Sequence, residues 1–156
     1  MGKLVSQAEA SRIVRARQRR GQTVVFTNGC FDIIHRGHVE YLARAKKLGD
    51  VLMIGLNSDQ SVKRLKGKGR PLLRFKDRAF ILAHLDMVDY VVPFGSFTPR
   101  ALIAKLLPDV LLKGGDYKIP DIVGAKEVTR SGGKVIVIPL IRGRSTSKIL
   151  SAVKKL

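Results

Sequence analysis

The sequence predicts an α/β domain built on a doubly wound, parallel, five-stranded sheet. Short, almost continuously apolar segments alternate along the chain with longer segments of helical periodicity. Strands of this kind are buried on both faces, as in parallel sheets that helices cover on each side. In such folds, ligands bind beyond the carboxyl ends of the strands.

The first half of the chain carries clear start and stop signals. Ser6 and Glu9 form a capping-box pattern that begins a helix, and Gly21 ends it. The β-branched run TVVFT predicts the first strand. The next expected elements are a helix over 37–47, a strand over 51–56, a basic connection over 63–78, a helix over 75–85 and a strand over 89–94.

The second half repeats the alternation. Thr98 is expected to cap a helix with Pro99 at its first position, which runs to Leu107. The remaining expected elements are a strand over 109–113, a helix over 121–130, a strand over 134–138 and a helix that begins near Ser145. The chain has 156 residues, which suits a single domain over 1–156.

Composition indicates the cellular compartment to expect for the protein. No apolar stretch approaches the length of a membrane span, so no transmembrane segment is expected. The first twenty residues lack the pattern of a secretory signal. Cys30 is the single cysteine and cannot form an internal disulfide. These features predict a cytoplasmic protein.

The net charge of +18, from 30 basic and 12 acidic residues, favours polyanionic partners. Nucleic acid, an anionic membrane surface and phosphorylated small molecules all qualify. The chain has no tryptophan and few aromatic residues among its basic ones, which disfavours a stacking platform for single strands. Nucleic acid or an anionic surface is therefore a partner that the sequence allows but does not favour.

The stretch TNGCFDIIHRGH follows the first strand and places His35 and His38 one turn apart at the start of a helix. Zinc would need further ligands, and the nearby candidates are Cys30 and Asp32. Two structural histidines are a second interpretation. A pair of phosphate-binding imidazoles is the third, and the position at a helix N-terminus with Gly37 between the histidines favours it.

Two motifs together resemble a known superfamily. His35 to His38 match an HxGH signature, and Arg144 to Ser147 match its partner motif, as in the Rossmann-like nucleotidyltransferases that include glycerol-3-phosphate cytidylyltransferase. Longer stretches, among them FTNGCFDIIHRGHVEYL and TPRALIAKLLPDVLLKGGDY, are similar to the D-glycero-β-D-manno-heptose 1-phosphate adenylyltransferases of bacterial ADP-heptose synthesis. The resemblance extends over about residues 21–150.

The resemblance implies an enzyme that transfers AMP from ATP to a sugar 1-phosphate and releases pyrophosphate. The product would be ADP-heptose, a precursor for lipopolysaccharide or a surface glycan. The sugar phosphate is largely dianionic at neutral pH, since its second pKa lies near about 6, and it needs no protein base. Mg²⁺ would be bound mainly by the ATP phosphates, with no protein metal ligand. A homodimer and a separate sugar kinase upstream are also implied.

The resemblance further implies residue roles. His35 and His38 would hold the α-phosphate and the leaving pyrophosphate, and Lys66 would close over them from a mobile basic connection. The implied nucleotide-binding residues are Gly29, Cys30, Phe31, Asp32, Lys63, Asp116, Arg144, Ser145 and Thr146, and Arg78 would bind the sugar phosphate. Asp32 could instead cap a helix, Asp116 could be an ordinary turn residue, and Arg78 could be an ion-pair partner. His84 is expected to be structural, on a core-facing helix.

Three rival functions stay open. A cytidylyltransferase for glycerol 3-phosphate and an FAD synthase would use the same chemistry, and no residue pattern distinguishes adenine from cytosine. A basic nucleic-acid-binding domain belongs to another class. It predicts steeply salt-dependent binding that tolerates changes at His35 and His38.

Overall fold

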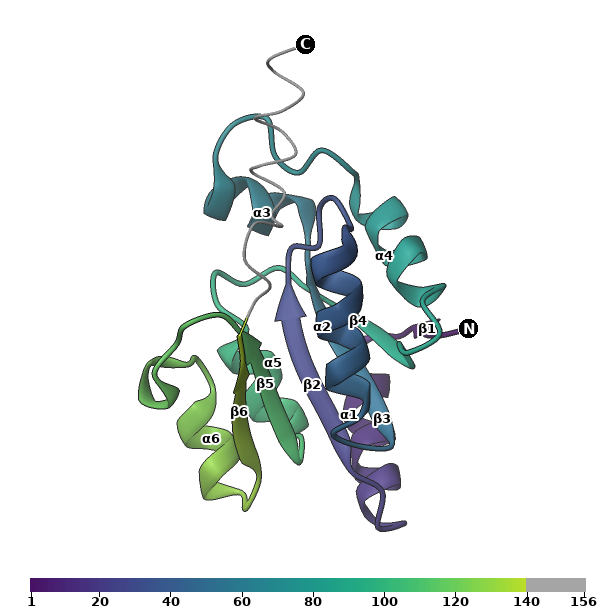
Figure 1. The fold of residues 1–156 in the computed structure, drawn as a ribbon, viewed down its shortest axis with the longest axis vertical. Coiled ribbons are helices and arrows are strands. Elements are labelled where there is room, and N and C mark those ends of the chain that lie inside the picture. The colour runs from purple at the N-terminus through teal and green to yellow at the C-terminus, as the bar shows by residue number, and fades with distance from the viewer. Residues whose placement is uncertain (140–156) are drawn as a thin grey trace.

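The computed structural model describes residues 1–139 and contains one parallel sheet of six strands with helices on both faces (Figure 1). The strand order is β1-β4-β3-β2-β5-β6, and every neighbouring pair is parallel. The elements are β1 (Lys3–Leu4), α1 (Gln7–Gln18), β2 (Val24–Gly29), α2 (Arg36–Lys46), β3 (Val51–Asn57), α3 (Asp59–Lys66), α4 (Phe75–Ala83), β4 (Tyr90–Phe94), α5 (Arg100–Leu106), β5 (Val110–Gly114), the 3₁₀ helix η1 (Ile119–Asp121), α6 (Ala125–Arg130) and β6 (Lys134–Ile138).

The predicted doubly wound parallel sheet is confirmed, but the predicted number of five strands is wrong. The additional strand is β1, which pairs with β4 at the edge of the sheet through Lys3 and Leu4. Two residues are too few to produce an apolar run or an alternation, so the sequence carried no periodic signal for this strand. The predicted capping box at the start of α1 is present, since Ser6 and Glu9 each bond the other's backbone N–H.

Three further boundaries differ from those expected. Part of the predicted basic connection is the helix α3, which Ser58 caps by accepting a hydrogen bond from the Ser61 backbone N–H at 3.2 Å. The N-cap of α5 is Pro99 and not Thr98. The helix expected over 121–130 is divided into η1 and α6, with Gly124 between them in the left-handed region at φ 88°. The helix expected from Ser145 lies outside the described residues.

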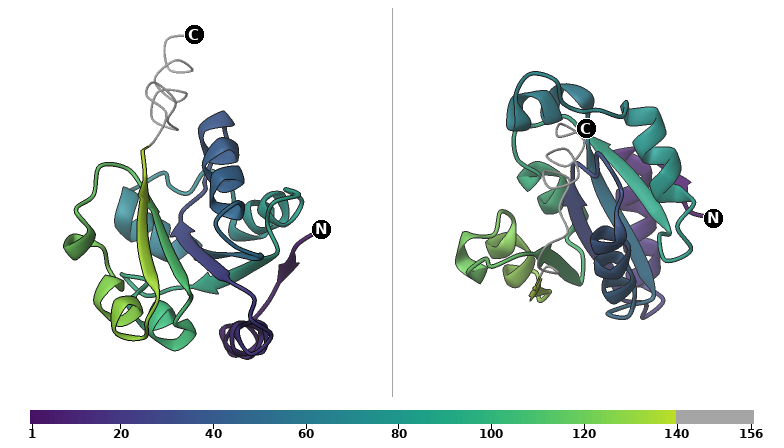
Figure 2. Two further views of the ribbon diagram at one scale, coloured as in Figure 1. Left: turned by 60° about the horizontal axis from the view of Figure 1, so that its bottom comes forward. Right: turned by 45° about the horizontal axis from the view of Figure 1, so that its top comes forward.

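The two faces of the sheet are covered by different helices. Helices α1, α5 and α6 supply one core cluster together with Phe26, Met53 and Leu111, while α2 and α4 supply the other with Val25, Ile54 and Leu112. Figure 2 (left) shows α2 and α4 on one side of the sheet and α1, α5 and α6 on the other. Alternate residues of one strand thus enter opposite cores, which explains why the strands read as continuous apolar runs.

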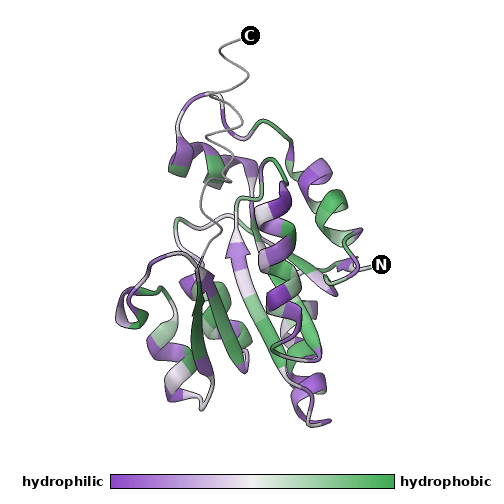
Figure 3. Ribbon diagram, viewed as in Figure 1, coloured by the Kyte–Doolittle hydropathy of each residue, from purple (hydrophilic) through white to green (hydrophobic). Residues whose placement is uncertain are grey.

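The chain reverses its direction of travel across the sheet at β2. Strands β3 and β4 lie on one side of β2, and β5 and β6 lie on the other. The topological switch point therefore lies at the carboxyl ends of β2 and β5, and folds of this class bind ligands in a crevice at that point. The hydropathy of β2 changes toward this point, from apolar along most of the strand to hydrophilic at its carboxyl end (Figure 3). No helix within residues 1–139 is long and apolar enough to cross a membrane.

Candidate active site

The loop from β2 to α2 turns sharply at Phe31. This residue has a positive φ of 43°, which is rare for a bulky side chain and is found where surrounding structure enforces it. Its buried ring packs over Gly29, where an added Cβ would lie 2.9 Å from the Cε2 atom of Phe31. Gly29 is thus required by a close contact, and the turn leads the chain to His35 at the N-cap of α2.

The two motif histidines lie against each other at the N-terminus of α2. Their ring centroids are 4.0 Å apart with an interplanar angle of 26°, and the Phe31 ring is 5.3 Å from that of His38. Burial, together with the nearby charge of His35, lowers the pKa of His38 to about 4. His38 is therefore neutral at pH 7 and can donate a ring N–H to an anion at a helix N-terminus.

The lowered pKa of His38 predicts a pH dependence of stability. The pKa of His38 in the folded chain, about 4, lies below its ordinary value of 6.5. As the pH falls, the unfolded chain therefore takes up a proton on His38 before the folded chain does. The resulting stabilisation is complete above pH 6.5 and is lost as the pH falls through about 4.

We therefore expect the free energy of unfolding to decrease more steeply between these pH values in the wild-type chain than in His38→Gln. Urea unfolding at several pH values measures both slopes. Parallel slopes in the two chains would contradict the expectation.

The zinc interpretation finds no support in the described part of the chain. Within residues 1–139 there is no group of three or more His, Cys, Asp or Glu side chains that could hold a metal ion. Structural zinc sites use four such ligands and catalytic sites use three.

Asp32 joins two loops. Its buried carboxylate accepts hydrogen bonds from the backbone N–H groups of Leu72 and Leu73, at 2.8 and 2.9 Å, and it pairs with Arg70 at 2.7 Å. The carboxylate thus fastens the loop between α3 and α4 to the loop after β2. This arrangement is neither a helix cap nor a side chain open to a nucleotide.

Arg78 makes a second connection between the same loops. Its guanidinium is fully buried and donates to the carbonyls of Cys30 and Leu73, at 2.6 and 3.0 Å, and to the carboxylate of Asp59 at 2.7 Å. These partners occupy Nε, Nη1 and Nη2. The geometry therefore favours the ion-pair interpretation of Arg78 over direct binding of a sugar phosphate.

The predicted lysines lie on the exposed surface of α3. Burial raises the pKa of the Cys30 thiol, and the strongest of the charges that oppose this rise is the ammonium of Lys66. The Lys66 ammonium is therefore near enough to the loop after β2 to interact electrostatically with Cys30. Lys63 is exposed on the same helix, and Asp116 is exposed in the loop after β5. Arg144, Ser145 and Thr146 lie outside the described residues.

The structure brings one residue to this edge that sequence reasoning missed. Lys113 is partly buried near the carboxyl end of β5, and its ammonium interacts electrostatically with Cys30 across the switch point. The available signal was a lysine in the otherwise apolar run VLLKGG. His84, in contrast, is exposed and stacks on Phe80 at 4.0 Å, so it does not face the core as expected.

Comparison with known proteins gives consistent matches. Residues 26–151 match the cytidylyltransferase-like family. The chain is 51% identical over 153 residues to the bifunctional protein HldE of Pasteurella multocida (strain Pm70) and 52% identical over 151 residues to that of Vibrio vulnificus (strain YJ016). These alignments cover 98% and 97% of this chain. The chain spans only 32% of the length of each of these relatives.

Two solved structures resemble the fold. The lipopolysaccharide core biosynthesis protein from Thermoplasma volcanium GSS1 has a TM-score of 0.62 and 27% identity, over 80% of this chain and 100% of that one. A pantoate-beta-alanine ligase from Francisella tularensis also has a TM-score of 0.62, with 16% identity over 99% of this chain and 77% of that one. The second match bears on the fold alone.

Proposed function

Because the chain belongs to the cytidylyltransferase-like family, we propose that it transfers AMP from ATP to D-glycero-β-D-manno-heptose 1-phosphate. The products are ADP-heptose and pyrophosphate. The observation that carries the proposal is the stacked pair of His35 and His38 at the N-terminus of α2, beside the switch point. The similarity to a protein named for lipopolysaccharide core biosynthesis supports the choice of a surface-glycan sugar.

The chemistry needs positioning and charge neutralisation more than proton transfer. An oxygen of the sugar phosphate attacks the α-phosphorus of ATP, and the bond from that phosphorus to the bridging oxygen of the β-phosphate breaks. The bridging oxygen keeps the electron pair and leaves with pyrophosphate. His38, neutral at pH 7, donates an N–H to phosphate oxygens whose negative charge grows, without having to lose a proton first.

Other residues complete the proposed site. Lys66 approaches the phosphates from α3, with Lys63 as its neighbour, while Gly29, Cys30 and Phe31 form the turn beneath the nucleotide. Arg144, Ser145 and Thr146 supply donors to the β- and γ-phosphates, and Asp116 lies on the nucleotide side. Mg²⁺ would be held mainly by the ATP phosphates and would add positive charge there.

Asp32 and Arg78 take positioning roles in this proposal. Each ties the β2–α2 loop to the α3–α4 loop, which sets the distance between the histidine pair and Lys66. This replaces the direct substrate contact expected of Arg78. The ion pair between Arg78 and the partly exposed Asp59, the first residue of α3, connects α3 to the same two loops.

The proposal extends to partners. The sugar 1-phosphate has to come from a sugar kinase reaction, which we assign to a separate kinase activity upstream. The resemblance to the heptose phosphate adenylyltransferases supports a homodimer, and the single cysteine, Cys30, supports a reaction in the cytoplasm.

The test is pyrophosphate release in the presence of Mg²⁺. ATP and CTP are each combined with heptose 1-phosphate, glycerol 3-phosphate and FMN. Turnover with ATP and heptose 1-phosphate alone is expected. Turnover with a different pair would contradict the proposed substrates but would still support nucleotidyl transfer as the reaction. If no pair reacts and nucleic acid binds with a steep salt dependence, the enzymatic proposal fails.

A further inference from the structure

Lys113 lies on the strand that faces the histidine loop across the switch point. It belongs to β5, which pairs with β2 through Val25 opposite Val110 and Phe26 opposite Leu111. The loop after β2 carries Cys30, and the Lys113 ammonium interacts electrostatically with that residue. The pairing of β2 with β5 ends at Phe26 and Leu111, whereas β5 continues to Gly114, so Lys113 lies beyond the paired part of the two strands, at their carboxyl ends.

The chain after Lys113 folds back over it. Gly115 has a φ of 127°, which side-chain-bearing residues rarely adopt, and a Cβ there would lie 3.0 Å from the Tyr117 ring. The Tyr117 ring in turn lies with its centroid 5.8 Å from the Lys113 ammonium. An aromatic ring at this distance attracts the cation only weakly compared with a carboxylate. The ring thus helps to remove the ammonium from water.

No acidic side chain within the described residues 1–139 pairs with this partly buried ammonium. All 12 Asp and Glu side chains of the sequence lie within the described residues 1–139, so every possible acidic side-chain partner can be checked. Five of them form ion pairs, with Arg70, Arg36, Arg78, Lys46 and Arg100, and none lies within 4.0 Å of Lys113. Burial lowers the pKa of Lys113 accordingly, although Cys30 opposes the change.

We propose that Lys113 binds a phosphoryl group of the substrates, opposite the histidine pair in the crevice between β2 and β5. A partly buried cation without an acidic partner is stabilised when an anion enters beside it, and this crevice is where a fold of this topology binds its ligand. The proposal rests on the proposed function for the identity of its ligands. The phosphoryl group belongs either to the nucleotide or to the sugar phosphate, and the two sources can be separated by experiment.

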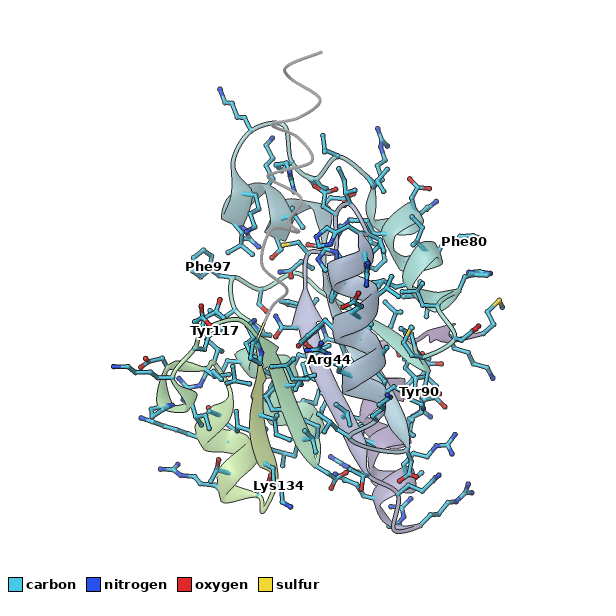
Figure 4. The ribbon with its side chains drawn as sticks, viewed as in Figure 1. Arg44, Phe80, Tyr90, Phe97, Tyr117 and Lys134 are labelled. Carbon is cyan, nitrogen blue, oxygen red and sulfur yellow. The ribbon has the colours of Figure 1, made fainter. Side chains whose placement is uncertain are left out.

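The test compares Lys113→Met with Lys134→Met. Methionine keeps the apolar stem of lysine and removes its charge. Lys134 is exposed and lies at the far end of the neighbouring strand β6 from Tyr117, so it controls for the loss of one positive charge (Figure 4). Isothermal calorimetry measures the binding of ATP, heptose 1-phosphate and inorganic pyrophosphate separately to the wild-type chain and to both variants.

Lys113→Met is expected to weaken the binding of at least one of these ligands by about 10-fold to 100-fold, the usual effect of a hydrogen bond to a charged group. Loss confined to heptose 1-phosphate assigns Lys113 to the acceptor. Loss for ATP or pyrophosphate assigns it to the nucleotide. Lys134→Met is expected to bind all three as the wild-type chain does.

Two results would overturn the inference. The first is that Lys113→Met binds every ligand that the wild-type chain binds within about twofold, or that the wild-type chain binds none of them. The second is a lowered melting temperature of Lys113→Met without a selective loss of phosphate binding, because that indicates a structural role. Pyrophosphate binding requires no turnover, so a loss in Lys113→Met would support the inference even if the proposed acceptor proves wrong.

Discussion

His38→Ala is expected to lower kcat for pyrophosphate release by about 10²- to 10³-fold, the usual loss when one preorganised donor to a developing charge is removed. The physical reason is the position of the His38 ring, which stacks on His35 at the start of α2 and is neutral at pH 7. A steady-state assay with the substrate pair that reacts best measures the effect. The loss should fall on kcat more than on KM, since the donor acts most strongly in the transition state.

His84→Ala is the matched control, because His84 is the only other histidine of the chain. It is exposed and stacks on the ring of Phe80, which is also exposed. Its removal should leave kcat unchanged. Circular dichroism should show that both variants are folded. A folded His38→Ala variant with wild-type kcat would remove the histidine pair from the mechanism.

Arg78→Met is expected to lower the free energy of unfolding by about 3 kcal/mol, at the lower end of the effect of breaking a buried ion pair from one side. The substitution leaves the carbonyls of Cys30 and Leu73 without their donor and leaves the Asp59 carboxylate unpaired. The side chain of Asp59 is 44% exposed and can regain water, which places the effect at that lower end. Urea unfolding followed by circular dichroism measures the change.

Arg100→Met provides the comparison for Arg78→Met. Arg100 also pairs with a carboxylate, that of Glu127, but its side chain is 65% exposed. Surface pairs of this kind contribute little, so the unfolding midpoint should hardly move. If both variants unfold at the same urea concentration, the buried connection through Arg78 does not stabilise the fold. If Arg78→Met is destabilised, a reduced kcat beside it would also support the positioning role.

The fold class and the placement of the two histidines at the start of a helix could be predicted because their signals are local. Buried parallel strands need apolar residues on both faces, so β2 to β6 appear as largely apolar runs. The capping box at Ser6 and the histidine spacing after β2 likewise involve residues close together in the chain. Polar residues with partners in the same helix or loop are the ones that a pattern can reveal.

The partners of Asp32, Arg78 and Lys113 could not be predicted, because they are distant in the sequence. Asp32 bonds Leu72, 40 residues away, and Arg78 bonds Cys30, 48 residues away. The burial of Lys113 depends on β5 lying beside β2, which only the order of the strands determines. The sequence by itself determined the strands β2 to β6, the capping box at Ser6 and the spacing of His35 and His38. The tertiary structure decided which charges are buried, and so which of them hold the loops together, because burial and pairing arise from contacts between segments that folding brings together.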